Sequence, residues 1–95
     1  MKTHYLKTKE PYFLAILDGK KNFEVRRDDR GFQRGDTVVL VKQVGKYLED
    51  ERSMRDAKIG EGYDFLKYKI GWILTGGQFG IEAGYIVFQL EKAQS

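Results

Sequence analysis

The segment NFEVRRDDRGFQRGDTVVLVKQV, residues 22–44, is the part of the chain that indicates its fold most directly. Its beginning alternates, with Phe23 and Val25 on one face and charged residues on the other, which is the pattern of a strand with one buried face. We therefore expect Phe23 and Val25 to anchor this strand to the core. A turn-rich stretch follows, and 37–44 (TVVLVKQV) is then the clearest strand, rich in β-branched residues.

Periodic apolar patterns on either side of this segment predict four further elements. They are a short strand at 4–9, a helix at 10–19, a long strand at 63–74 and a last strand at 85–90. Pro11 suits the first turn of the helix and Gly19 suits its left-handed end. Helical spacing predicts one apolar helix face, formed by Tyr12, Phe13, Ile16 and Leu17.

The long strand is predicted to contribute to the core through alternate residues. Tyr68, Ile70, Trp72 and Leu74 would share its inner face, and Gly71 is expected to mark a bulge or a bend. The segment between residues 75 and 84 is a glycine-rich connection whose apolar side chains, Phe79 among them, are placed to form an adaptable lip.

These elements predict an α+β fold, a small mixed β-barrel of five to six strands with an N-terminal helix closing one side. We expect a single domain over residues 1–95, with a polar excursion loop at about 45–62. Such barrels bury alternate residues and leave the loops at the rim for binding.

Composition excludes several kinds of chemistry. The chain has no cysteine and one histidine, which excludes disulfides, thiolate-bound zinc and a cysteine nucleophile, and it makes a Ser-His-Asp arrangement improbable. Asp28 and Asp29 are adjacent acids in a turn, where solvation is commoner than magnesium binding, so we expect no metal and no cofactor. No apolar run has the length of a membrane span, so we expect a cytoplasmic protein without membrane contact.

Charges of both signs are concentrated between residues 18 and 36. The first 36 residues hold nine Lys or Arg against six Asp or Glu, which is the whole net charge of +3. Two interpretations compete. The charged side chains form a solvated ladder on the outside of a strand, or they form a pocket wall that holds a polar ligand, with Lys and Arg donating and Glu accepting.

The same residues carry a resemblance to a known family. The chain resembles the ASCH domains, specifically a small phage and bacterial subfamily, strongly over residues 4–44 and more loosely over 68–90. The specific part is a G-x-K-x-x-E-x-R motif followed by an acidic turn and a Gly-Asp pair. In this chain these are Gly19, Lys21, Glu24, Arg26, Asp28-Asp29-Arg30 and Gly35-Asp36.

This resemblance implies a barrel of the PUA type and a cleft between helix and barrel that binds RNA or a nucleotide-like ligand. The motif residues would line the cleft. Flanking cations and aromatic side chains are further candidates because of their positions in the sequence. The candidate ligand-binding residues are Lys7, Tyr12, Lys21, Glu24, Arg26, Arg30 and Phe79. Asp36 would hold its loop, and a structural hydrogen bond is the expected role of His4.

Two alternatives remain open from the sequence. A related ASCH branch hydrolyses acetylated cytidine with the motif lysine as base and a threonine nucleophile, but this chain has Glu24 at the threonine position. An enzyme would therefore use Lys21 as base and Glu24 to position water or substrate. The third hypothesis is a phage or bacterial adaptor that contacts another protein through residues 45–62. The oligomeric state does not follow from the sequence.

Overall fold

The computed structural model describes residues 1–42 and 64–92, which form one helix and five strands. In chain order these are β1 (Thr3–Thr8), α1 (Glu10–Leu17), β2 (Phe23–Arg27), β3 (Thr37–Lys42), β4 (Asp64–Thr75) and β5 (Tyr85–Lys92). The predicted loop at 45–62 lies outside the described residues.

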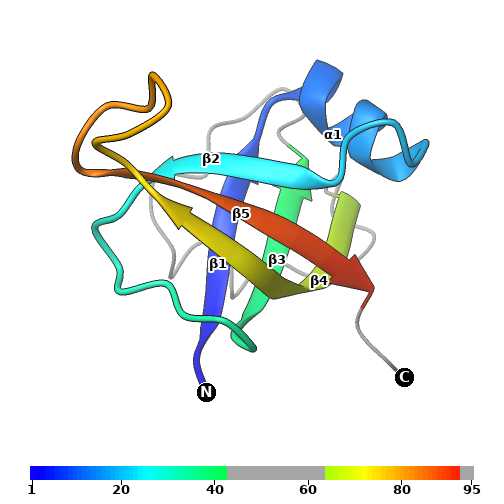
Figure 1. Cartoon of the computed structure of the whole chain (residues 1–95). Coiled ribbons are helices and arrows are strands. Elements are labelled where there is room, and N and C mark those ends of the chain that lie inside the picture. Colours follow the sequence, from blue (N-terminus) through cyan, green and yellow to red (C-terminus); the bar gives the residue numbers. More distant parts are fainter. Residues whose placement is uncertain (43–63, 93–95) are drawn as a thin grey trace.

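The strands form a single curled sheet in the order β1-β3-β4-β5-β2. The pair β1 and β3 is parallel, and the other three pairs are antiparallel. The sheet bends so far that β2 and β5 pass across β1 and β3, and α1 lies at one end of this half-barrel (Figure 1). The α+β prediction of a five-stranded mixed barrel closed at one side by a helix is confirmed.

The core fills the concave side of the curl. Its largest fully buried side chains are Leu6, Phe13, Val38, Leu40, Ile70, Ile86 and Phe88. Val41 is buried in a second cluster with Tyr5, Val39 and Phe65. The helix contributes Phe13 and Ile16, which are one turn apart on its inner face. The predicted helix face is too wide, because Tyr12 and Leu17 are more than half exposed. An eight-residue helix at the end of a barrel covers the core with a narrow stripe only.

The end of α1 determines where the next strand begins. Gly19 adopts a φ of 77°, the left-handed conformation predicted for it, and its backbone N–H donates to Ile16. The N–H groups of Lys20 and Lys21 both donate to the carbonyl of Ala15. This tight turn brings Lys21 back against the end of the helix, immediately before β2.

The inner and outer faces of β2 are opposite to the prediction. Phe23 and Val25 are 43% and 50% exposed, whereas Glu24 is only 4% exposed, so the apolar pair does not anchor the strand to the core. The pairing of Glu24 with the fully buried Phe88 on β5 places the carboxylate on the concave side. Alternation identified two faces correctly but assigned the wrong one to the interior.

A bulge in β4 causes a second difference between the structure and the prediction. The strand pairs Ile70 with Leu90 and then Ile73 with Phe88, so the register shifts at the predicted position of Gly71. Past the shift Ile73 packs against the core and Trp72 turns outward with 63% exposure. The expectation that Trp72 is a core residue is therefore wrong, whereas Tyr68, before the bulge, packs against the core as expected.

A buried polar contact holds the β2–β3 connection. Nε2 of His4 lies 2.8 Å from Oδ2 of Asp36, and the Asp36 carboxylate also accepts the backbone N–H groups of Lys2 and Gln33. Burial alone would raise the pKa of Asp36, but these hydrogen bonds outweigh it and hold the pKa below its usual range. The ring of Phe32 packs 4.6 Å from that of His4. The structural role expected for His4 is confirmed.

Candidate functional site

A pocket of about 360 Å³ lies where the end of β1, the start of α1 and β2 meet. It is lined by Lys7, Thr8, Lys9, Tyr12, Lys21, Glu24, Val25 and Arg26. Five of the seven predicted ligand-binding residues are therefore brought together in one place. Three segments separated in the sequence supply them, which the curl of the sheet makes possible.

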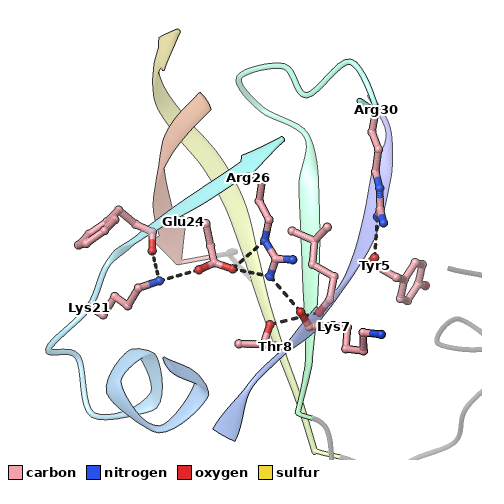
Figure 2. Close-up of polar contacts among 9 residues, drawn as sticks. Tyr5, Lys7, Thr8, Lys21, Glu24, Arg26 and Arg30 are labelled. Atoms are coloured by element: carbon pink, nitrogen blue, oxygen red, sulfur yellow. Dashed lines mark hydrogen bonds and ion pairs between the residues drawn. The ribbon is translucent and has the colours of Figure 1, made fainter. Parts of the chain in front are cut away.

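Glu24 is the centre of the polar contacts in this pocket. Its Oε2 accepts a hydrogen bond of 2.6 Å from Nζ of Lys21, and its Oε1 accepts one of 2.8 Å from Nη2 of Arg26. A second Arg26 donor, Nε, lies 3.3 Å from Oε1. A carboxylate this buried needs charged partners, and the two cations supply them from both sides (Figure 2).

Arginines also join the two edges of the half-barrel. Strands β1 and β2 are at opposite ends of the sheet order, yet Nη2 of Arg26 donates to the backbone oxygen of Lys7 at 3.1 Å. Nη1 of Arg30 donates to the oxygen of Tyr5 at 2.7 Å, two residues further along the same edge (Figure 2). The guanidinium groups thus satisfy carbonyls on an edge strand of the sheet.

Arg30 does not line the pocket. Its contacts include the Tyr5 carbonyl and a longer ion pair, 3.9 Å, with Asp29. Arg30 therefore lies beside the pocket, between the two edge strands of the half-barrel.

Positive charge surrounds the buried carboxylate. Of the described residues that line the pocket, Lys7, Lys9, Lys21 and Arg26 are cationic and Glu24 alone is acidic. The cations outnumber the acid although two of them already contact it. An anion that enters the pocket therefore meets a favourable field from several directions.

The pocket also has an aromatic wall. Tyr12 is 54% exposed on the outer side of α1, and Nζ of Lys21 lies 5.8 Å from the centre of its ring. The same ammonium lies 4.9 Å from the centre of the Phe23 ring on the outside of β2. Lys21 thus stands between the pocket and the outer face of the sheet, in contact with a ring on each side.

Sequence reasoning did not assign Thr8 and Lys9 to the site. Thr8 is buried, lines the pocket and donates its hydroxyl to the oxygen of Leu6 at 3.2 Å. Both residues lie where β1 passes into α1, and the sequence showed them only as the end of the predicted strand at 4–9. Their position opposite β2 depends on the curl of the sheet, for which no local signal exists.

Phe79 lies away from the pocket. It belongs to the connection between β4 and β5, which is at the opposite end of the barrel from α1 (Figure 1). That connection touches the other end of β2, where the N–H of Asp28 donates to Gly84. Phe79 is 84% exposed and has a left-handed φ of 52°. Phe79, one of the predicted ligand-binding residues, therefore does not line the pocket with the motif residues.

No group of three or more metal-ligating side chains occurs within residues 1–42 and 64–92. Over the same residues no helix is long and apolar enough to cross a membrane.

Comparison with known proteins provides the family. The family model described as a domain of unknown function, DUF3850, matches residues 3–90 of the chain. The chain belongs to the DUF3850 family. The matched range begins at the first residue of β1 and includes every residue that lines the pocket.

A curated phage protein is also similar to this DUF3850 chain. It is the "Uncharacterized 12.9 kDa protein in GpA 3'region" of Escherichia phage P2, 46% identical over 43 residues. The aligned part covers 45% of this chain and 39% of the phage protein.

Proposed function

We propose that the pocket around Glu24 binds a nucleotide or a nucleotide unit of single-stranded RNA. The observation that carries this proposal is the ring of cations around one buried carboxylate, with the exposed Tyr12 at its edge. Phosphate groups suit the lysine and arginine donors, and an aromatic ring suits an unpaired base. The resemblance of the motif to the ASCH domains, which implies a barrel of the PUA type, supports the same ligand class.

Lys21 is the residue on which we expect binding to depend most. Among the described residues its ammonium donates to two oxygens, those of Glu24 and the Phe23 backbone. An ammonium has three hydrogens, so one remains for a ligand. Glu24 holds the lysine in a single orientation, which reduces the entropy lost when the ligand binds.

Salt dependence and a matched pair of lysine variants test the proposal. A fluorescent single-stranded RNA octamer is titrated with the wild type, with Lys21→Ala and with Lys67→Ala, whose lysine is exposed on β4 away from the pocket. We expect Lys21→Ala to weaken binding and to reduce the salt slope by about 1, the effect of losing one phosphate contact. Equal effects of the two variants, or binding that does not change with salt, contradict the proposal.

A second candidate is hydrolysis of an acylated nucleoside such as acetylated cytidine. One observation favours it, since the buried Thr8 hydroxyl lines the same pocket as Lys21 and Glu24. The contacts of Lys21 favour binding instead, because an ammonium held by two acceptors is arranged as a donor and not as a base. Incubation with acetylated cytidine, followed by chromatography, separates the two. Conversion that is lost in Thr8→Val supports the hydrolase.

A further inference from the structure

The outer face of β2, β5 and β4 is more apolar than a solvated sheet face. Phe23, Val25 and Trp72 are each at least 43% exposed there, and they come from two different strands. Val87 lies between them, paired with Val25 on one side and with Leu74 on the other. A continuous group of exposed apolar side chains on a small domain indicates a binding surface.

This surface is hollowed into a groove of about 360 Å³. Its lining consists of Asn22, Phe23, Trp72, Leu74, Val87, Phe88 and Gln89. Three aromatic rings, those of Phe23, Trp72 and Phe88, and two side-chain amides are therefore within the described lining, and none of its members is acidic. The amide oxygen of Gln89 accepts the backbone N–H of Trp72 at 3.3 Å, which ties the outward-turned segment of the bulge to β5.

Cationic side chains lie at both ends of the exposed apolar pair Phe23 and Val25 on β2. At its beginning Nζ of Lys21 lies 4.9 Å from the centre of the Phe23 ring. At its end the guanidinium of Arg27 lies 5.6 Å from the centre of the Tyr85 ring, and Tyr85 is the partner of Arg27 on β5. Aromatic rings flanked by cations suit a ligand that has flat bases and a negatively charged backbone.

The surface is continuous with the pocket around Glu24. Val25 lines the pocket and Phe23 lines the groove, and both point outward from the same strand, two residues apart. Two residues along a strand correspond to about 7 Å. Glu24, which Lys21 and Arg26 contact, is the one acidic side chain in the two described linings, and the groove itself has none.

We propose that this outer face, centred on Phe23, Val87 and Trp72, stacks unpaired bases of a single-stranded RNA whose neighbouring nucleotide occupies the pocket. This inference rests on the proposed function and extends it from one nucleotide to a longer strand. Sheet faces with exposed aromatic side chains bind RNA in this manner in other folds. Trp72 faces outward because the bulge at Gly71 shifts the register of β4, so the bulge positions the ring for this role.

The test compares a short and a long ligand. Uridine monophosphate occupies the pocket alone, whereas an RNA octamer also reaches the outer face. Trp72→Ala is measured beside Phe79→Ala, which removes another exposed aromatic ring at the far end of the barrel. We expect Trp72→Ala to weaken octamer binding by roughly 5- to 150-fold, the effect of losing one base stack, and to leave monophosphate binding unchanged. Phe79→Ala should bind both ligands like the wild type.

Intrinsic fluorescence gives a second measurement on the unaltered protein. Trp72 is the only tryptophan, so its emission reports on this face alone. We expect the octamer to quench it and the monophosphate to leave it unchanged.

The outcomes separate the two proposals. Octamer binding that depends on Lys21 but not on Trp72, without quenching, refutes the stacking surface and leaves the pocket as a nucleotide site. Absence of binding by either ligand refutes both. A loss of affinity in Phe79→Ala in place of Trp72→Ala moves the stacking site to the β4–β5 connection and overturns the inference. Self-association that Trp72→Ala abolishes, without RNA binding, assigns the face to a second copy of the chain and overturns it too.

Discussion

Strands β2 and β3 each turn alternate residues toward the concave side of the sheet, yet the residues that they turn inward are of opposite kinds. In β3 the interior receives Val38 and Leu40, both 0% exposed. In β2 the interior receives Glu24, and Phe23 and Val25 face outward. The difference shows that β3 serves the core, whereas β2 carries a polar site on one face and an apolar surface on the other. Because this inverted arrangement does not favour the core, we infer that it is kept for binding.

The largest expected effect is in β3. Leu40→Ala removes a fully buried side chain and should lower the free energy of unfolding by about 2–5 kcal/mol, the combined effect of lost burial and a cavity. Urea unfolding followed by circular dichroism measures this. A loss below 1 kcal/mol would mean that β3 is not the centre of the core, and the contrast with β2 would disappear.

Glu24→Ala should have the next largest effect. It removes the carboxylate that Lys21 and Arg26 share, and we expect the free energy of unfolding to fall by about 2 kcal/mol. This is below the value for a fully buried pair because both cations are partly exposed. The matched variant replaces all three residues together, as Lys21→Met, Glu24→Leu and Arg26→Met. It should recover stability while losing RNA binding, as expected if the carboxylate is kept for function. A triple variant less stable than Glu24→Ala would instead make the charges structural.

Asp36 is the other buried carboxylate among the described residues, and its contribution to the free energy of unfolding should depend on pH. Its folded pKa is lowered, so its contribution to stability is complete above the unfolded value of about 3.9 and is lost as pH falls through the folded pKa. Asp36→Asn cannot titrate at this position. The wild type should therefore exceed it by about 1 kcal/mol at pH 6, and the difference should shrink below pH 4. Urea unfolding at pH 6, 4 and 3 tests this, and a constant difference would contradict it.

The smallest effect is expected for the outer face of β2. Val25→Ala should change the free energy of unfolding by less than about 0.5 kcal/mol, because the side chain is half exposed. The same unfolding measurement is used. A loss comparable with that of Leu40→Ala would show that the outer face is covered in solution, by the rest of the chain or by another copy.

Much of the fold was predictable from local signals. Pro11 and Gly19 marked the ends of α1, and β-branched residues marked β3. The register shift in β4 was predicted at Gly71, but its consequence for Trp72 was not. A bulge moves every following residue to the other face, so the alternation read from the first half of the strand misplaces the second half.

The candidate site was predictable in part. The spacing of Lys21, Glu24 and Arg26 placed three residues together because they are close in the sequence and lie on or beside one strand. Thr8 and Lys9 joined them only through the curl of the sheet, and Arg30 and Phe79 were separated from the pocket by the same geometry.

The sequence by itself determined the number of elements in the described chain, their kinds and which residues of β2 share a face. These properties follow from backbone preferences and from the period of each element, which are local. The tertiary structure alone decided which face of β2 is buried. Glu24 lies inside because Lys21, held at the end of α1, and Arg26, bound to the Lys7 carbonyl on β1, neutralise it there. Partners from separate segments make burial of a charge possible, and no pattern within a single strand contains them.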